Sequence, residues 1–375
     1  MEKLHGLYGL NKTEGLMNSI LNEDLEYIYE NVERECGKFK DSNIFITGCC
    51  GFLGFYFMHF FNRYKKELGI KSIVAVDNFQ VGKPSWIDNI IKDSNIELLN
   101  FDIIDGDLSK IKRDKSNSFV IHMASIASPV FYRKYPIKTI EANIWGLKRL
   151  LDDYKNESLR GFLFFSSSEI YGDPTPENIP TPETYRGNVN TIGPRACYDE
   201  SKRFGETICY EYAKEYNLPI TLARPFNNYG PGMKLGDKRV PADFAKAVIN
   251  NDDIVILSDG KPTRTFCYIS DAISGYLKVL LHGKFDVFNI GTAGPEISIL
   301  DLANIYKSKA EKLFGYCGKV KYQKSDEKNY LTDNPNRRCP VIKKANSILN
   351  YNPNISIGDG VERFLKYLIE EGIKE

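Results

Sequence analysis

Tyr198 and Lys202 stand four residues apart in a segment that reads YDESK, a spacing that could do chemistry. On a helix this spacing places both side chains on one face. A phenol with an ordinary pKa of about 10 is a poor base near neutral pH. A neighbouring ammonium group stabilises the phenolate and lowers its pKa, so the pair predicts a tyrosine that takes a proton from a hydroxyl. The alternative is an ordinary solvent-exposed Tyr/Lys pair.

A second polar cluster, Ser166, Ser167, Ser168 and Glu169, comes directly after an apolar run that ends at residue 165. In open α/β folds, ligand-binding groups gather where parallel strands end. A hydroxyl there can hydrogen-bond a reacting hydroxyl, and a carboxylate can move a proton. The alternative is that these serines only cap a helix.

A glycine-rich turn, with Gly48, Gly51 and Gly54 spaced G-x-x-G-x-x-G, follows an apolar run at residues 43–47 and opens a helical stretch. Glycines at such a turn let the backbone approach a pyrophosphate, and the helix N-terminus then faces the phosphates. Asp77 ends the second apolar run, where a carboxylate accepts hydrogen bonds from ribose hydroxyls and repels a 2′-phosphate. The turn and Asp77 together predict NAD rather than NADP. Asp102 ends the third run, where it either meets the adenine amino group or simply caps a turn.

The elements that must position these residues alternate between short apolar runs and helical stretches. The runs are residues 43–47, 73–76, 96–100, 119–124, 161–165 and 220–223. Such alternation is typical of a parallel sheet covered by helices on both faces. We therefore expect an α/β fold, a Rossmann-type doubly wound parallel sheet with a smaller, interleaved C-terminal substrate domain.

The domain boundaries follow from changes in pattern along the chain. Residues 1–42 form an N-terminal helical extension, in which residues 24–36 carry apolar side chains at helical spacing. That helix packs either on the body or on a second subunit. We expect an NAD-binding Rossmann domain at 43–226, which 266–292 rejoins through a strand at 285–290, and a mainly substrate-binding domain at 227–375.

Composition excludes several classes of protein. The 50 Lys and Arg residues balance 49 Asp and Glu residues, and this net charge of +1 gives no field for nucleic acid or an anionic membrane. None of the eight cysteines forms a C-x-x-C pair, so we expect no metal site. Without a signal-like N-terminus or a long apolar stretch, the sequence predicts a cytoplasmic protein that binds neither nucleic acid nor membrane.

In these residues the chain resembles the extended short-chain dehydrogenases/reductases that act on nucleotide sugars, the NAD-dependent epimerase/dehydratase family. Within that family it is most similar to the UDP-glucuronate decarboxylases. The resemblance covers about residues 43–350 and rests on the Gly48 turn, Asp77 and the Tyr198/Lys202 pair, and on four longer segments. These segments are residues 122–129 (HMASIASP), 136–139 (PIKT), 166–174 (SSSEIYGDP) and 187–202 (GNVNTIGPRACYDESK).

The resemblance implies a redox-neutral reaction with tightly held NAD. Tyr198 would take the proton of the sugar C4 hydroxyl while hydride passes to NAD⁺. The resulting 4-keto uronate would lose CO₂ through an enolate, followed by protonation at C5 and return of hydride. Ser167 would lie close to the C4 oxygen, and Glu169 would orient the sugar ring or handle the C5 proton. The resemblance also implies a homodimer that pairs through helices near 139–155 and 199–216.

The resemblance implies roles for the following residues. The catalytic residues are Ser167, Glu169, Tyr198 and Lys202. The cofactor-binding residues are Gly48, Gly51, Phe52, Leu53, Gly54, Asp77, Asn78, Asp102, Ile103, Ala124, Ser166, Tyr198 and Lys202. The substrate-binding residues are Ser128, Arg195, Asn227, Arg239, Arg264 and Arg338, with Arg264 placed either at the diphosphate or at the uronate carboxylate.

Other activities stay open. Ser168 stands where 4,6-dehydratases of the family have an aspartate that protonates the departing hydroxyl, so loss of water is disfavoured. A 4-epimerase is the other alternative within the family, and a non-catalytic NAD-binding regulator is disfavoured because Tyr198 and Lys202 are both intact. Some residues depart from the decarboxylase pattern: Cys49-Cys50 replaces Gly-Ala in the glycine turn, and Leu257-Ser258 replaces a Tyr-Gly near the nucleotide base.

Overall fold

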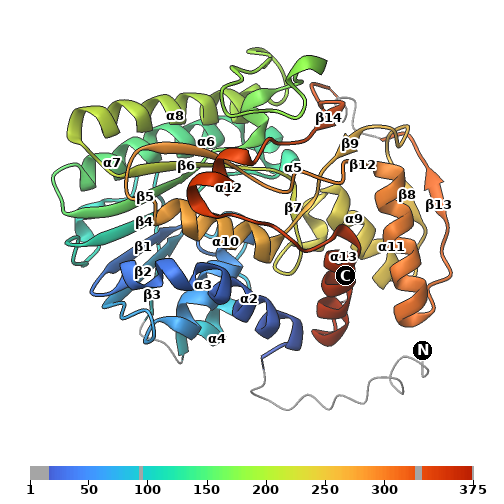
Figure 1. The fold of residues 1–375 in the computed structure, drawn as a ribbon, viewed down its shortest axis with the longest axis horizontal. Helices are drawn as coiled ribbons and strands as arrows, with labels where there is room; N and C mark the ends of the chain where they lie inside the picture. The colour runs from blue at the N-terminus through green and yellow to red at the C-terminus, as the bar shows by residue number, and fades with distance from the viewer. Residues whose placement is uncertain (1–16, 93–95, 326–331, 374–375) are drawn as a thin grey trace.

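A parallel sheet of seven strands forms the centre of the molecule (Figure 1). The computed structural model describes residues 17–92, 96–325 and 332–373. In spatial order the strands are β11 (Asp286–Ile290), β6 (Ile220–Pro225), β5 (Leu159–Phe165), β4 (Ser118–His122), β1 (Asn43–Thr47), β2 (Ser72–Asp77) and β3 (Ile96–Asn100). Because each pair is parallel, all carboxyl ends meet at one edge of the sheet. The expected Rossmann-type sheet is therefore confirmed.

Helices cover both faces of this sheet. One face packs against α2 (Ser19–Cys36), α3 (Phe52–Tyr64) and α10 (Ile269–Leu280). The other packs against α7 (Leu147–Tyr154) and α8 (Ala196–Tyr216), and α6 (Pro136–Glu141) packs on α8. Strand β1 shows why its sequence is apolar throughout. Ile44 and Ile46 belong to the first core and Phe45 to the second, since successive side chains point to opposite faces.

Shorter elements connect these layers. They are η1 (Gly37–Phe39), α4 (Trp86–Lys92), η2 (Leu108–Lys110), α5 (Pro129–Lys134), η3 (Ala142–Gly146), η4 (Ser168–Tyr171) and η5 (Pro176–Asn178).

The C-terminal portion is built from small sheets and helices and lies beside the carboxyl edge of the main sheet. Its elements are β7 (Asn228–Tyr229), η6 (Leu235–Asp237), α9 (Val240–Ile249), β8 (Ile254–Ile256), β9 (Thr263–Arg264), β10 (Cys267–Tyr268), β12 (Ile297–Ser298), α11 (Ile299–Phe314), β13 (Val320–Tyr322), β14 (Arg337–Arg338), α12 (Lys343–Leu349) and α13 (Ile357–Glu370). The chain leaves this portion once, because α10 packs on the main sheet and β11 pairs with β6.

The N-terminal helix α2 packs on the body of its own chain, against α10, α13 and α3. It begins at Ser19, where the Asn18 side chain accepts the N–H groups of Ile20 and Leu21. Its Asp24 is fully buried and accepts hydrogen bonds from the hydroxyls of Tyr56, at 2.6 Å, and Tyr268, at 2.8 Å. Arg363 of α13 donates to the same carboxylate at 2.8 Å, so three distant segments hold the helix through one side chain. Residues 1–16 of the expected extension lie outside the described residues.

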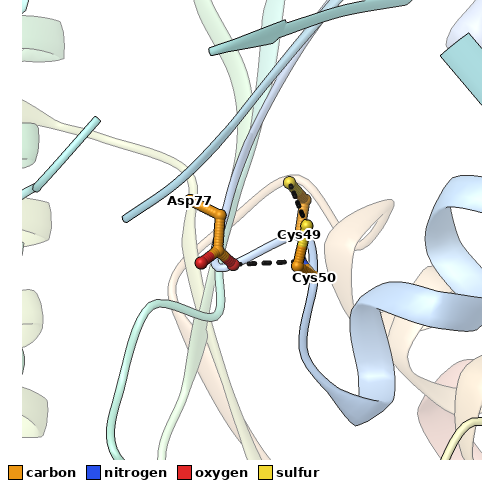
Figure 2. Close-up of side chains that lie close together, drawn as sticks. All are labelled: Cys49, Cys50 and Asp77. Carbon is orange, nitrogen blue, oxygen red and sulfur yellow. Dashed lines mark hydrogen bonds between the residues drawn. The ribbon is translucent and has the colours of Figure 1, made fainter. Parts of the chain in front are cut away.

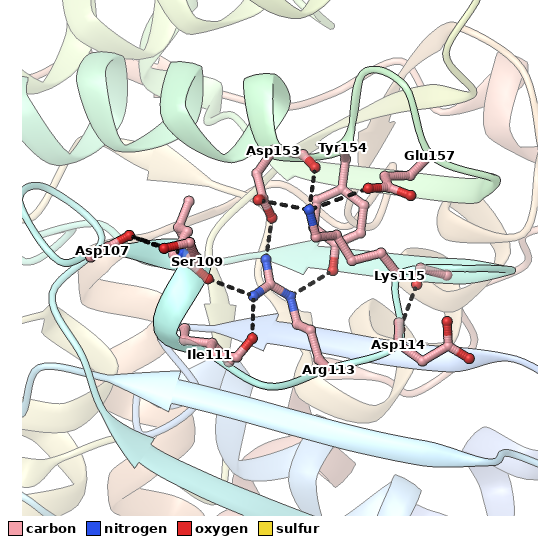
Figure 3. Close-up of polar contacts among 11 residues, drawn as sticks. Asp107, Ser109, Ile111, Arg113, Asp114, Lys115, Asp153, Tyr154 and Glu157 are labelled. Carbon is pink, nitrogen blue, oxygen red and sulfur yellow. Dashed lines mark hydrogen bonds and ion pairs between the residues drawn. The ribbon is translucent and has the colours of Figure 1, made fainter.

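An ionic network around the buried Arg113 side chain closes the amino edge of the sheet, between the loop before β4 and the end of α7 (Figure 3). The Arg113 guanidinium pairs with Asp153, donates to the Tyr154 hydroxyl at 3.1 Å, and lies 4.3 Å from the centre of the Phe45 ring. Lys115 pairs with the same Asp153 at 2.9 Å and with Glu157 at 3.3 Å. Within the described ranges, no helix is both long enough and apolar enough to cross a membrane.

Candidate active site

A cavity of about 800 Å³ lies at the carboxyl edge of the main sheet, facing the C-terminal portion. Its wall includes the glycine turn, the ends of β2 and β5, the start of α8 and several residues of the small sheets. The predicted site residues that line it are Gly48, Gly51, Phe52, Leu53, Gly54, Asp77, Asn78, Asp102, Ile103, Ala124, Ser128, Ser166, Ser167, Glu169, Arg195, Tyr198, Lys202, Asn227, Arg239, Arg264 and Arg338. The structure thus brings residues from both portions of the chain to one cavity.

The glycine turn is fixed by close backbone contacts. Gly48 has φ of +71°, and a Cβ on it would lie 2.6 Å from the Ala124 backbone nitrogen. A Cβ on Gly54 would lie 2.2 Å from the Cys49 carbonyl oxygen, so α3 can approach the turn only with glycine there. Gly51 caps α3 without a side chain, and a Cβ on it would meet only the Gly48 carbonyl at 3.4 Å. The first N–H groups of α3 therefore face the cavity as donors that a pyrophosphate fits.

Carboxylates end β2 and β3 beside this turn. Asp77 accepts the Cys50 backbone N–H at 3.0 Å and the Phe79 backbone N–H at 2.8 Å. Burial raises the pKa of Asp77, and these two backbone donors oppose that rise. Asn78 donates to Asp102 at 2.9 Å, which joins the two strand ends. A carboxylate at the end of the second strand fits the ribose of NAD and disfavours the extra phosphate of NADP.

Tyr198 and Lys202 lie on the cavity side of α8, and both are buried. The Lys202 ammonium donates to the Phe165 carbonyl at 2.7 Å, and burial lowers its pKa to about 7. Burial also raises the pKa of Tyr198, an effect that a hydrogen bond with Ser167 partly opposes. The expectation that Lys202 makes the phenol more acidic is therefore wrong for the protein alone. Each group is desolvated, and burial disfavours the charged form of both.

Glu169, at the start of η4, is held by two arginines that come from distant segments. Arg338 of β14 binds both carboxylate oxygens, and Arg195, just before α8, binds one of them. Burial alone would raise the pKa of Glu169, but the two guanidinium groups outweigh it and lower the pKa to about 2. Glu169 is therefore a carboxylate at neutral pH with no proton to give, which favours the orienting role over proton transfer at C5.

Arg264 of β9 differs from these two arginines. It is buried, yet in the part of the chain that the structure describes no carboxylate lies within ion-pair distance of it. Its guanidinium donates instead to main-chain carbonyls, including that of Asn336 at 3.1 Å. Burial, together with the positive charge of Arg338, lowers the pKa of Arg264 to about 9. A buried cation without an anion fits the negative charge of a ligand.

The remaining predicted side chains also bond to the protein. Asn227 donates to the Thr265 carbonyl at 2.9 Å, and Ser128 donates to the Asp237 carbonyl at 3.2 Å. Arg239 pairs with Asp237, and its guanidinium lies 5.3 Å from the centre of the Phe52 ring. The Ser166 hydroxyl donates to Glu206, which pairs with Arg224 behind the cavity wall, so this hydroxyl is already engaged.

Tyr132 and Asp199 were not among the predicted site residues. The Tyr132 ring stacks on Tyr198 with centroids 5.2 Å apart, and its buried hydroxyl has no hydrogen-bond partner among the described residues. Asp199 is buried, and one of its oxygens lies 3.6 Å from Arg195. Burial, then Glu169, raises the pKa of Asp199 to about 7. For Asp199 the signal was its place inside the YDESK segment, whereas Tyr132 carries no local signal that links it to α8.

Comparisons with known proteins agree with this geometry. The sequence profile described as the NAD dependent epimerase/dehydratase family matches residues 44–291. UDP-glucuronic acid decarboxylase 1 of Arabidopsis thaliana is 33% identical over 327 residues, which are 87% of this chain and 69% of that protein. A Xenopus tropicalis protein of the same name is 33% identical over 88% of this chain and 72% of its own.

Solved structures are also similar. The UDP-glucuronic acid 4-epimerase of Bacillus cereus, in complex with UDP-glucuronic acid and NAD, superposes with a TM-score of 0.69. It is 26% identical, over 88% of this chain and 100% of its own. A dTDP-glucose 4,6-dehydratase of Streptomyces venezuelae, at 19% identity and a TM-score of 0.72 over 87% and 96% of the two chains, shows likeness of fold alone. The glycine turn, the carboxylates beside it and the matching profile lead to one conclusion: the chain belongs to the NAD-dependent epimerase/dehydratase family, and NAD is its cofactor.

Proposed function

We propose that the protein catalyses the NAD-dependent decarboxylation of a nucleotide-linked uronic acid, of the kind that converts UDP-glucuronate into UDP-xylose. The observation that carries this proposal is the surplus of buried arginine beside Tyr198. Arg195, Arg264 and Arg338 line one cavity with Glu169, and Arg264 has no carboxylate partner among the described residues. A nucleotide-linked uronate brings both a diphosphate and a carboxylate, which guanidinium groups bind well. The curated relatives named UDP-glucuronic acid decarboxylase support the same substrate class.

In this proposal each side chain has a defined part. Tyr198 accepts the proton of the C4 hydroxyl, and Ser167 hydrogen-bonds the same oxygen. Bound NAD⁺ supplies the acceptor and later the donor of one hydride, and its positive nicotinamide ring favours the phenolate. The C4 ketone accepts the electron pair of the breaking C5–carboxylate bond as CO₂ leaves. A proton from solvent then adds to C5 in place of the lost carboxylate, the C4 oxygen regains its proton from Tyr198, and no net oxidation occurs.

The side chain at position 168 supports loss of CO₂ over loss of water. Ser168 is buried at the start of η4, and a serine hydroxyl is too weak an acid to protonate a departing hydroxide. Glu169, whose pKa is lowered to about 2 after Arg195 and Arg338 outweigh burial, cannot replace that acid. A 4-epimerase acting on the same uronate is the second candidate, because the Bacillus cereus 4-epimerase named for UDP-glucuronic acid shares the fold at 26% identity.

The test is incubation of the NAD-loaded protein with UDP-, CDP- and dTDP-glucuronate, followed by mass spectrometry and a CO₂ assay. We expect a pentose nucleotide, lighter than its substrate by CO₂, with at least one of the three. A product of unchanged mass but altered retention time would indicate the epimerase, and loss of water would indicate a dehydratase. Three unchanged substrates would reject the proposal. A matched reaction with Tyr198→Phe shows whether turnover comes from this site.

We also propose that the protein is a cytoplasmic homodimer. Four apolar side chains on α6, η3 and α8 are largely exposed: Ile137 (65%), Trp145 (55%), Phe204 (52%) and Tyr210 (47%). These helices overlap the two predicted pairing segments, and large apolar side chains exposed there fit an interface. All eight cysteines are free, which fits a reducing compartment. Light scattering should give a dimer mass, Phe204→Asp should shift it toward a monomer, and a monomeric wild type would reject the dimer.

A further inference from the structure

Two adjacent thiols stand inside the glycine turn, between Gly48 and Gly51 (Figure 2). The Cys49 and Cys50 sulfurs are 3.9 Å apart, and the Cys50 backbone N–H donates to Asp77 at 3.0 Å. A sulfur from each cysteine and one oxygen of Asp77 lie within 4.8 Å of one another. Among residues 17–92, 96–325 and 332–373, this is the one cluster of three such donors. This cluster joins the glycine turn to the carboxylate at the end of β2.

The sulfur spacing fits one bridging metal ion and not a disulfide. Zinc–sulfur bonds of about 2.3 Å in a tetrahedral site place two sulfurs about 3.8 Å apart. A disulfide requires the sulfurs to approach to about 2.05 Å. The observed 3.9 Å therefore matches the sulfur separation of a site with two thiolates, and close contacts at Gly48 and Gly54 fix the turn that carries both cysteines.

The chemistry of the donors selects the class of ion. Two thiolates with one carboxylate favour zinc or cadmium, whereas magnesium and calcium prefer ligand sets made only of oxygen. The sequence predicts no metal site because it lacks C-x-x-C pairs, but adjacent cysteines are a different arrangement. Here the turn, rather than the spacing along a loop, sets the separation of the sulfurs.

Access to the site is through the dinucleotide cavity. Cys50 and Asp77 line that cavity, whereas Cys49 is fully buried behind them. An ion therefore meets Cys50 and Asp77 first, from the side on which the adenosine half of NAD is expected, with Cys49 behind them. Asp77 is also the predicted acceptor for the adenosine ribose, so the same carboxylate serves both ligands.

We propose that Cys49, Cys50 and Asp77 bind a thiophilic divalent cation of the zinc and cadmium class, and that this ion and NAD exclude each other. Binding breaks two S–H bonds and forms two metal–sulfur bonds, and the two protons pass to solvent. Asp77 contributes a carboxylate oxygen, and water from the cavity completes the coordination. The proposal rests on the NAD site and is independent of which sugar the protein acts on.

The experiment titrates Cd²⁺ into the full-length, NAD-free protein and follows the ultraviolet thiolate-to-cadmium absorption band, with native mass spectrometry as a second readout. We expect one Cd²⁺ bound per chain with loss of two thiol protons, and no such complex with Mg²⁺. Cys49→Ala and Cys50→Ala should each abolish the band. Cys317→Ser, which removes the exposed cysteine far along the chain, is the matched control and should keep it.

Competition with NAD tests whether the ion and NAD exclude each other. It uses the wild type, so the result does not depend on whether a variant folds. At NAD 100-fold above its Kd, the apparent Kd for Cd²⁺ should rise about 100-fold. A band that persists in the double variant Cys49→Ala/Cys50→Ala would overturn the site. An apparent Kd that NAD leaves unchanged would overturn the exclusion, whatever the outcome of the sugar-nucleotide assays.

Discussion

The two edges of the central sheet both bury arginine, but they use it differently. At the amino edge, Arg113 has a partner for each side of its guanidinium: Asp153, the Tyr154 hydroxyl, and main-chain carbonyls at 3.2 and 3.4 Å. At the carboxyl edge, Arg195 and Arg338 share the carboxylate of Glu169, with Asp199 3.6 Å from Arg195, and Arg264 pairs with none among the described residues.

The difference separates charge that holds the fold from charge that is kept for a ligand. Removing a buried cation from water is costly, and a protein offsets that cost with its own anions wherever only stability is at stake. Arg195, Arg264 and Arg338 outnumber the carboxyl groups of Glu169 and Asp199 that lie with them, so part of that cost remains until an anion binds. This comparison predicts that matched substitutions at the two edges affect different quantities.

The largest expected difference is between two tyrosines. Tyr198→Phe at the carboxyl edge should reduce turnover by about 10³-fold or more, because the group that moves the C4 proton is lost. Stability should change little, since the phenol is buried with few partners. Tyr154→Phe at the amino edge removes the acceptor of the Arg113 Nε–H, so it should cost about 1 kcal/mol of unfolding free energy and leave turnover intact. Initial rates and urea unfolding on both variants check this, and equal losses of activity would contradict it.

The second difference is between two arginines changed to methionine. Arg113→Met leaves Asp153 with only Lys115 and should lower the unfolding free energy by about 3 kcal/mol. Arg264→Met should lower it by less than about 1 kcal/mol, because relief of burial and of repulsion by Arg338 offsets the lost carbonyl contacts.

The same Arg264→Met variant should raise KM for the nucleotide sugar about 10- to 100-fold, since a charge-assisted contact to the ligand is removed. Denaturant titration and steady-state kinetics separate the two effects. If Arg264→Met loses as much unfolding free energy as Arg113→Met, Arg264 is a structural side chain.

What could be predicted from the sequence follows the same division. The strand, turn and helix from residue 43 to residue 64 were readable because their contacts are local, and the strand ends placed Asp77 and Ser167 at the cavity. Long-range pairs were not readable. Glu169 meets an arginine from residue 338, and Asp24 meets tyrosines from α3 and β10, so neither could be derived from spacing. In the protein alone, burial raises the pKa of Tyr198, and no motif reveals that burial.

The third prediction separates close packing from ligand approach within the glycine turn. Gly54→Ala places a methyl group 2.2 Å from the Cys49 carbonyl oxygen, so we expect a loss of about 2 kcal/mol in unfolding free energy as well as weaker NAD binding. Gly51→Ala meets only an ordinary contact of 3.4 Å, so its stability should change by less than about 1 kcal/mol while NAD affinity falls. Fluorescence titration with NAD and urea unfolding measure both quantities, and similar stabilities for the two variants would argue against a turn fixed by contact with Cys49.

The last difference concerns the pH dependence that Lys202 imposes on stability. Burial lowers the pKa of Lys202 from 10.5 to about 7, so between these values the unfolded chain holds a proton that the folded chain has released. Stability linked to Lys202 therefore rises with pH from about 7 toward 10.5, with a limiting slope of about 1.4 kcal/mol per pH unit, and is lowest below pH 7. Lys202→Met should remove this slope. In urea unfolding without NAD, the unfolding free energy of the wild type minus that of the variant should therefore increase from pH 7 to pH 9. If this free-energy difference stays constant from pH 7 to pH 9, Lys202 keeps its proton in the folded protein. The carboxyl edge would then carry one more uncompensated positive charge than the comparison of the two edges assigns to it.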